Sequence, residues 1–397
     1  MESSMQVWPK ESRVENGELL LSADIQMTGS ENKNLWFKMP EAYADRIGRN
    51  CDPFAIAVVM LAMKAGCKLH MHGVVSRSLL RNLEEFQAAW SCWLPNRLAE
   101  VEMVVDEVEE QVSSVGKRTV ATSFSGGVDS CFTAYMHATK RMGWRNLPVT
   151  SGLFVHGLDI PLSDPEGYRS ISKRVEVLLN SLGLEMLRMS TNLRDVLDPH
   201  VNWINSFGTG VAACLSIFQG CFFAGLIPGS YAYDVLHLDN GSNPIGDPLL
   251  GSDSFRIVHD GARYRRFDKI KAINEWPEAR EHLRVCWQGA SSEYNCCRCE
   301  KCIRNILTFR ALGVPQPPCF PRDVDDDQIR MLELKGASLN TIANLVDSAR
   351  KAGIRESWLS AAEYALRKGR RKMFIKTRVN QPINRGLKRI KVRRTET

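Results

Sequence analysis

The segment Ser-Gly-Gly-Val-Asp-Ser, residues 125–130, constrains this chain more than any other part of its sequence. Before it, the apolar residues of Arg118–Phe124 predict a short buried strand. After it, apolar residues recur at helical spacing from Val128 to about Met142 without an intervening Pro or Gly, which predicts a helix. A strand that turns through two glycines into a helix N-terminus is typical of a loop that binds phosphate.

Each residue type in this segment suits an anionic ligand. Gly126 and Gly127 let backbone N–H groups approach an anion without a Cβ in the way, and the new helix adds its N-terminal dipole. The hydroxyls of Ser125 and Ser130 are further donors, and Asp129 is a candidate ligand for a Mg²⁺ ion that bridges phosphates. The alternative is a serine-rich turn with no ligand, but the strand, loop and helix together favour a phosphate site.

The segment resembles the loop of the PP-loop superfamily, the N-type ATP pyrophosphatases or adenine nucleotide alpha hydrolase-like proteins. The resemblance implies that residues 125–130, Val128 included, bind ATP with Mg²⁺, grip its β- and γ-phosphates and leave the α-phosphate open. A substrate oxygen would attack there, pyrophosphate would leave and an adenylated intermediate would form. Gly116-Lys117-Arg118 is not a Walker A loop, because it lacks the hydroxyl residue after the lysine and the upstream glycine.

From Arg118 onward, predicted strands and helices alternate, which indicates an α/β fold with a doubly wound parallel sheet. Ligands of such sheets bind outside the carboxyl ends of the strands. The strand ends therefore nominate His156, Gly157, Gly229 and Ser230 as nucleotide-binding residues. The resemblance implies that backbone at His156 and Gly157 receives the adenine. The alternative is a structural histidine at position 156, which is the more common role of a lone histidine.

Lys269 is the second candidate catalytic residue, beside Asp129. It stands where PP-loop enzymes place a lysine that opens a helix and points at the nucleotide phosphates. A cation there would neutralise charge that develops on departing pyrophosphate. The alternative is the solvated basic start of a helix.

A cysteine cluster follows, with thiols at 296, 299 and 302 and a further cysteine, Cys286, ten residues upstream of the first. Thiolates in this pattern fold around one metal ion, and four of them complete a tetrahedral Zn²⁺ site. The order resembles the zinc knuckle of the 7-cyano-7-deazaguanine synthases, except that Cys297 stands where those enzymes typically have glycine. The sequence leaves open whether Cys296 or Cys297 binds the metal.

An iron–sulfur cluster is the alternative occupant of this cysteine cluster, because the same triple opens ferredoxin-type sequences. No Cys-Pro follows Cys302, and the fourth ligand would have to be Cys286 or Cys319. Both features favour zinc.

The formal charge of +7 is concentrated in one segment. Residues 364–394 contain thirteen Lys and Arg and no acidic residue, whereas the remainder of the chain has 39 basic and 45 acidic residues. Such a block is typical of a tail that binds RNA or another polyanion through phosphate contacts, or of a solvated terminus.

Length and composition predict three segments: an N-terminal α/β module over residues 1–115 of unknown role, a PP-loop domain with the metal knuckle over 116–320, and a helical, basic part over 321–397. A helix is expected over Leu98–Val112. The N-terminus has no apolar signal segment, the uncharged stretch 203–233 is interpreted as buried interior and not as a membrane span, and twelve cysteines without an export signal favour the reducing cytoplasm.

These features predict an ATP-dependent ligase or synthase that adenylates a carboxylate, amide or ureido oxygen of a small-molecule acceptor. Ammonia or another nucleophile would then displace AMP. Two alternatives stay open: a PP-loop sulfurtransferase acting on tRNA or other RNA, and a non-catalytic adenine-nucleotide-binding protein. The sequence does not identify the acceptor or say whether the chain forms a homo-oligomer.

Overall fold

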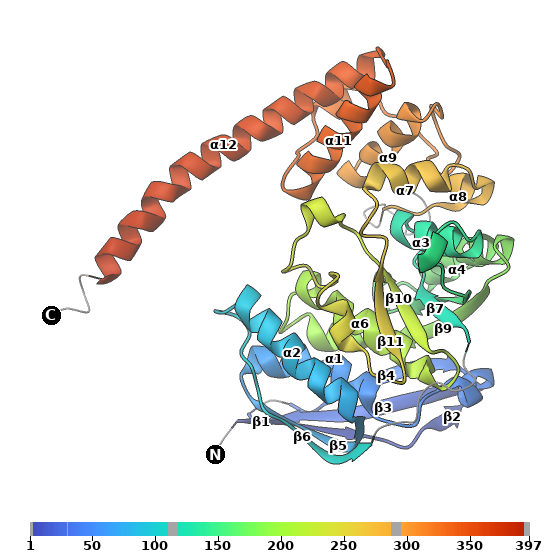
Figure 1. Cartoon of the computed structure of the whole chain (residues 1–397), viewed down its shortest axis with the longest axis vertical. Helices are drawn as coiled ribbons and strands as arrows, with labels where there is room; N and C mark the ends of the chain where they lie inside the picture. The colour runs from blue at the N-terminus through green and yellow to red at the C-terminus, as the bar shows by residue number, and fades with distance from the viewer. Residues whose placement is uncertain (1–2, 30, 110–117, 287–294, 393–397) are drawn as a thin grey trace. The chain divides into compact units, whose positions relative to one another are not determined.

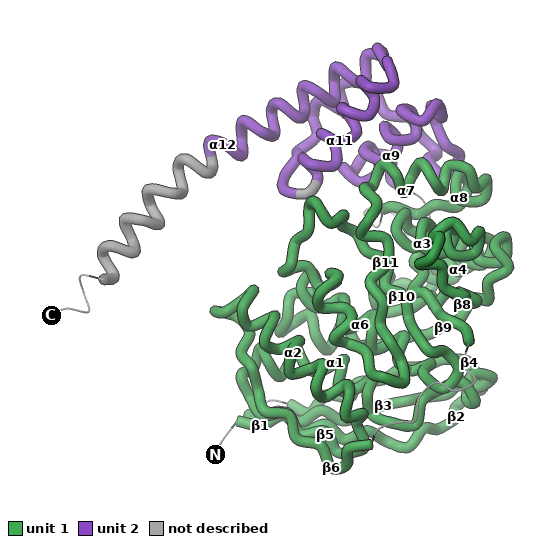
Figure 2. The backbone as a smooth tube through the Cα atoms, viewed as in Figure 1, with its two compact units in different colours: residues 1–293 green, residues 294–397 purple. Residues whose placement is uncertain are grey.

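The computed structural model describes residues 3–29, 31–109, 118–286 and 295–392. The chain forms two compact units, Met1–Glu293 and Tyr294–Thr397 (Figure 2). The division at about residues 115 and 320 that the sequence suggests stays a prediction about domains.

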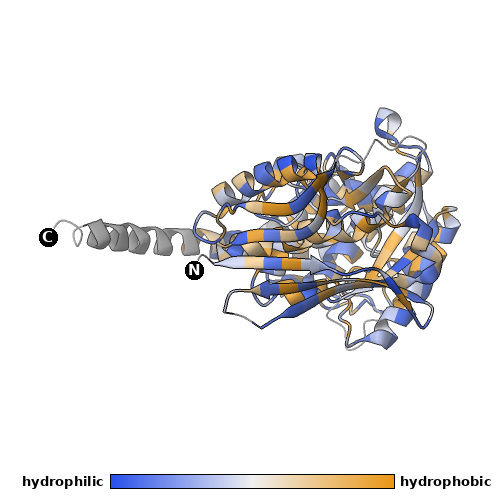
Figure 3. Cartoon of the chain, turned by 90° about the horizontal axis from the view of Figure 1, so that it is seen from below, coloured by the Kyte–Doolittle hydropathy of each residue, from blue (hydrophilic) through white to orange (hydrophobic). Residues whose placement is uncertain are grey.

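The first unit is built on one eleven-stranded sheet (Figure 1). Hydrophobic and hydrophilic residues alternate along some of its strands, such as β4, whereas strands of the parallel half, such as β10, are almost wholly buried (Figure 3). The strands are β1 Ser4–Pro9, β2 Arg13–Glu15, β3 Glu18–Met27, β4 Lys33–Pro40, β5 Lys68–Ser76, β6 Met103–Glu109, β7 Val120–Ser123, β8 Val149–His156, β9 Glu185–Thr191, β10 Ala224–Pro228 and β11 Arg256–Asp260.

The strand order is β11-β10-β7-β8-β9-β4-β3-β1-β5-β6, and β2 pairs with β3 outside this path. The five strands from β11 to β9 are parallel, and their chain order reverses at β7, as in doubly wound sheets. The predicted α/β class with a largely parallel sheet is therefore confirmed. The other half is mixed: β4, β3 and β1 are joined by antiparallel pairs, whereas β1, β5 and β6 are parallel neighbours.

Helices form a layer on each face of the parallel half of the sheet. Helices α3 and α4 pack on β7–β9, with α7 and α8 outside them; α1, α2, α5 and α6 form the opposite layer, which extends over the mixed half. Nearly every side chain of α1 is buried, which suits a helix placed between the sheet and α6.

The helices of this unit are α1 Asp52–Ala65, α2 Arg77–Trp93, α3 Val128–Ala138, α4 Pro165–Ser181, α5 Leu193–Leu197, α6 Trp203–Ser216, α7 Arg266–Ile273 and α8 Pro277–His282. Short 3₁₀ turns lie at Glu41–Arg46, Gly143–Arg145, Ile217–Gly220, Tyr233–Val235 and Asp247–Leu250.

The helix expected over Leu98–Val112 is wrong. Residues 103–109 form β6, which pairs in parallel with β5 at the edge of the sheet. The valines of this segment are β-branched and favour a pleated strand once a neighbouring strand is available. Residues 110–112 lie outside the described part of the chain.

The second unit is helical where it is described. Its helices are α9 Glu300–Ala311, α10 Asp326–Arg330, α11 Ala337–Lys351 and α12 Ser357–Val392. The first turns of α12 carry buried side chains, among them Trp358 and Leu366, and pack on α10 and α11. Among the helices of the described residues, none has both the length and the apolar character needed to cross a membrane.

Candidate functional site

The Ser125–Ser130 loop lies directly after β7, where the strand order reverses. Gly126 has φ +73°, a conformation that favours glycine, and Gly127 is the N-cap of α3. Ser125 donates its backbone N–H to Ser130 Oγ at 3.3 Å, and Ser130 Oγ donates to Gly127 O at 3.1 Å. Arg284 donates its backbone N–H to Gly126 O at 2.9 Å. The loop is thus held by its own hydroxyls and by a neighbouring segment.

Two cationic side chains from α7 contact the carboxylate of this loop. Lys269 Nζ donates to Asp129 Oδ1 at 2.9 Å, and Arg266 Nη2 lies 3.0 Å from Asp129 Oδ2. Lys269 is 1% exposed and also donates to Gly229 O, at the carboxyl end of β10. The structure therefore brings together both predicted catalytic residues and one predicted nucleotide-binding glycine.

This pairing bears on the expectation that Asp129 binds Mg²⁺. Each of its carboxylate oxygens contacts one cationic group, Lys269 or Arg266, and a carboxylate oxygen has two lone pairs. A Mg²⁺ ion at Asp129 would therefore share the carboxylate with these two cations, which lie close enough to assist in binding phosphate oxygens.

His156 and Gly157 lie at the carboxyl end of β8, beside β7. His156 Nε2 donates to Pro161 O at 3.0 Å, and its ring stacks on Tyr168 at 4.3 Å. Burial, only partly offset by the Pro161 contact, lowers the pKa of His156, so the ring is neutral at pH 7. These contacts give the side chain a structural role, whichever ligand the backbone receives.

Gly157 cannot carry a side chain, because its φ is +100° and a Cβ would come within 1.8 Å of Thr191 O. The two predicted residues after β10 differ in exposure. Gly229 is buried against His259, whereas Ser230 is exposed. Ser230 is accordingly the one of this pair that solvent reaches.

Arg284 is a residue that the sequence did not single out. Its backbone N–H binds the loop, and its buried guanidinium lies in the electrostatic field of Asp159 and Asp164, which follow β8. Burial lowers its pKa from the usual value, and Nε has no hydrogen-bond partner among the described residues. No motif marks this arginine; its position two residues after the end of α8 and two before Cys286 gives no signal by itself.

The sequence also did not single out two buried carboxylates: Asp260, the last residue of β11, and Asp247, which begins the 3₁₀ turn Asp247–Leu250. Asp260 accepts from Thr133 Oγ1 at 2.8 Å and lies 3.6 Å from His137 Nε2. Burial acts to raise the pKa of Asp260, but His137, Thr133 and Arg145 outweigh it and lower the pKa. Asp247, which pairs with His259 Nδ1 at 2.7 Å, has its pKa raised because burial dominates. Neither has a sequence motif.

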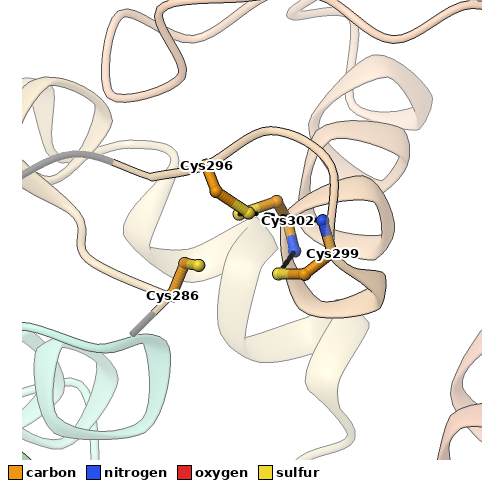
Figure 4. Close-up of side chains that lie close together, drawn as sticks. All are labelled: Cys286, Cys296, Cys299 and Cys302. Atoms are coloured by element: carbon orange, nitrogen blue, oxygen red, sulfur yellow. Dashed lines mark hydrogen bonds between the residues drawn. The ribbon is translucent and has the colours of Figure 1, made fainter. Parts of the chain in front are cut away.

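The cysteine cluster is assembled as the spacing predicts. One sulfur from each of its residues lies within 4.8 Å of the others (Figure 4): Cys286, Cys296, Cys299 and Cys302. Cys296 Sγ lies 3.8 Å from Cys302 Sγ, and the backbone N–H groups of Arg298 and Cys299 approach Cys296 Sγ at 3.5 and 3.3 Å. Four thiols so close, with backbone donors aimed at sulfur, suit a thiolate-bound metal ion such as Zn²⁺.

Cys297 is placed outside this cluster. Its thiol donates to Asn295 O at 3.3 Å, and burial raises its pKa, which opposes thiolate formation. Its φ of +56° lies in the left-handed region, where glycine is least strained. The geometry therefore favours Cys296 as the ligand and explains why glycine suits position 297.

Comparison of the chain with protein-family models, with curated proteins and with solved structures finds no match. Function is therefore inferred from the residues described above.

Proposed function

We propose that this chain is an ATP-dependent enzyme of the PP-loop type that adenylates an acceptor oxygen and releases pyrophosphate. Ammonia or another nucleophile then displaces AMP. The observation that carries the proposal is the buried Lys269 ammonium, paired with Asp129 of the Ser125–Ser130 loop at the reversal of a parallel sheet. The Ser125–Ser130 motif, the N-terminus of α3 and the Lys269 ammonium therefore lie together.

The charge around the loop supports a polyanionic ligand. Lys269 and Arg266 contact Asp129, and the backbone of Arg284 binds Gly126. Partly buried cations are stabilised by phosphate oxygens more than exposed ones are, because less solvent screens them. The same cations would stabilise the charge that develops on pyrophosphate as the bond to the α-phosphorus breaks.

Binding of nucleotides with different numbers of phosphates tests this assignment without knowledge of the acceptor. ATP and pyrophosphate, each with Mg²⁺, should bind at least about tenfold more tightly than AMP, because charge-assisted contacts to the β- and γ-phosphates contribute roughly 1.5–3 kcal/mol each. Lys269→Met should weaken ATP and pyrophosphate binding and leave AMP binding unchanged. Equal affinities for ATP and AMP in the wild-type protein would contradict the proposal.

Asp268→Asn is the matched control for this experiment. Asp268 lies on the first turn of the same helix, and its Oδ2 accepts from the backbone N–H of Arg265 at 3.3 Å. The amide oxygen of asparagine can accept the same hydrogen bond, so the variant should keep its stability and its preference for triphosphate.

RNA sulfur transfer is the second candidate, favoured by the thiol cluster and by the exposed cations of α12, such as Arg367 and Lys372. Elemental analysis separates the two. Zinc bound by the cysteine cluster supports the adenylating ligase, whereas iron with acid-labile sulfide favours sulfur transfer. A nucleotide-binding protein without turnover is distinguished from both by the absence of pyrophosphate release.

A further inference from the structure

A second set of metal-binding side chains lies on the mixed half of the sheet: His70 and His72 of β5 and Asp106 of β6. One ligand atom from each lies within 4.8 Å of the others. His70 and His72 occupy alternate positions of one strand, so both side chains point to the same face. We propose that these three residues bind a divalent transition-metal ion and leave at least one coordination position open.

The distances between the ligand atoms fit a common metal ion. His70 Nε2 lies 3.0 Å from Asp106 Oδ1, and His72 Nδ1 lies 3.3 Å from Asp106 Oδ2. Ligands held about 2.1 Å from a metal at tetrahedral or octahedral angles are separated by about 3.0–3.4 Å. The three side chains therefore need little rearrangement to coordinate one ion.

A neighbouring amide sets the tautomer of one imidazole. His72 Nε2 donates to Gln6 Oε1 at 2.7 Å, and Gln6 Nε2 donates to Ser4 Oγ at 3.4 Å. In the neutral ring, Nδ1 then presents a lone pair to Asp106 Oδ2. Two acceptors 3.3 Å apart repel unless a proton or a cation lies between them. Metal-binding histidines commonly donate their second ring N–H in this way, which fixes the ring and raises its basicity.

The sheet holds these residues rigidly while leaving them accessible. Trp8 of β1 stacks on His72 with ring centroids 4.9 Å apart and planes within 3°. The register pairs His70 with Val104 and then shifts between Met71 and Val74, a bulge of the kind that often aims side chains at a site. The side chains of the two histidines are 28% and 25% exposed, so solvent and ions reach them.

The donor set indicates which ions fit. Two imidazoles and one carboxylate suit Zn²⁺, Fe²⁺, Co²⁺ and related ions, whereas the cysteine cluster is a closed set of four thiols. Three protein ligands leave room for water or for an anionic ligand. This site is independent of the proposed ATP chemistry, because its residues come from β5 and β6, at the opposite end of the strand order from β10 and β11.

Cobalt titration of the full chain tests the proposal, because Co²⁺ reports its ligands spectroscopically. We expect two bound ions per chain: one with an intense thiolate-to-cobalt charge-transfer band, and one with weak visible bands typical of nitrogen and oxygen ligands. His72→Ala and the nearly isosteric Asp106→Asn should each lose the second signal, with affinity reduced by more than about 100-fold. Gln6→Leu should reduce it by about tenfold through the orientation of His72.

The thiolate band serves as an internal reporter of folding in every variant. His200→Ala is the matched control: His200 is also partly buried in the first unit, but its Nε2 contacts Lys33 Nζ at 2.7 Å, and the variant should retain both signals. Wild-type protein that binds cobalt only at the thiolates would overturn the proposal. Wild-type affinity in both His72→Ala and Asp106→Asn would overturn it as well.

Discussion

The Ser125–Ser130 loop and the cysteine cluster are both short polar segments that the sequence marks clearly, but different forces hold them. The loop is flanked by side chains that are nearly fully buried, such as Val120, Phe124 and Phe132, and is fixed by backbone hydrogen bonds. The cysteine cluster includes two residues that are only partly buried, Cys296 and Cys299, and its contacts run largely between thiols and adjacent N–H groups.

The difference predicts opposite responses to loss of ligand. A loop supported by a sheet core keeps its shape when empty, so changes there should alter chemistry more than folding. Thiolates gathered at one point repel one another unless a cation is bound, so a metal ion bound at the cysteine cluster would contribute folding free energy. We therefore expect the loop to keep its shape without a ligand and the cysteine cluster to depend on a metal ion for its folding.

Removal of the metal should have the largest effect. In zinc-binding peptides, metal binding supplies on the order of 10 kcal/mol of apparent folding free energy at neutral pH. Cys302→Ser, at a fully buried ligand, should yield protein that lacks the metal and has lost helical signal from the second unit. Elemental analysis and circular dichroism measure the two consequences.

Cys297→Gly is the control for that experiment. This cysteine is buried but its thiol contacts Asn295 O, and glycine relieves the cost of its φ of +56°. The variant should keep the metal ion at the cysteine cluster. Metal loss in this variant with retention in a Cys296→Ser variant would reverse the ligand assignment.

Asp129→Ala should have the next largest effect, on turnover and not on the fold. Its side chain lies at the surface end of the loop, 17% exposed, and aligns Lys269 and Arg266. Pyrophosphate release should fall by about 100-fold or more, as on loss of a preorganised electrostatic group. Unchanged circular dichroism with lost turnover supports the comparison; a grossly unfolded variant would show that the loop also depends on its ion pairs for stability.

Truncation after Ile375 should have an intermediate effect, confined to polyanion binding. Ala365 and Leu366 are buried within the second unit, so a deletion that begins at residue 364 would remove core residues as well as charge. Removing residues 376–397 instead should leave ATP turnover intact and lower the slope of log affinity for single-stranded RNA against log salt by about 0.7 per lost phosphate contact. An unchanged slope would exclude this segment from RNA binding.

The smallest effect should be a pH dependence from Asp260. Because its pKa is lowered in the folded protein, its ionised form contributes stability that is fully present above the unfolded pKa of about 3.9 and is lost as pH falls through the folded pKa. Wild-type protein should therefore lose more stability than Asp260→Asn between pH 5 and pH 3. If the urea midpoints of the wild-type protein and of Asp260→Asn fell by the same amount between pH 5 and pH 3, His137, Thr133 and Arg145 would not stabilise the ionised form of Asp260.

Sequence reasoning succeeded where local pattern decides structure. The strand ends that nominated His156 and Gly229 lie where β8 and β10 end, because buried parallel strands form continuous apolar runs that the sequence shows directly. It failed at Leu98–Val112, because pairing with β5, a non-local contact, decided the conformation. The same distinction applies to sites: the cysteine spacing is local, whereas the approach of Asp106 to His70 depends on strand register.

The products of ATP cleavage test the central claim most directly. Full-length protein should be incubated with Mg²⁺, ATP labelled at the α-phosphate and fractionated small-molecule acceptors, with Lys269→Met as the inactive comparison. With ammonium present as the nucleophile, we expect labelled AMP and equimolar pyrophosphate in the fraction that contains the acceptor, and neither product with the variant. Labelled ADP with release of orthophosphate would contradict the claim that the Ser125–Ser130 loop holds the β- and γ-phosphates and exposes the α-phosphate to attack.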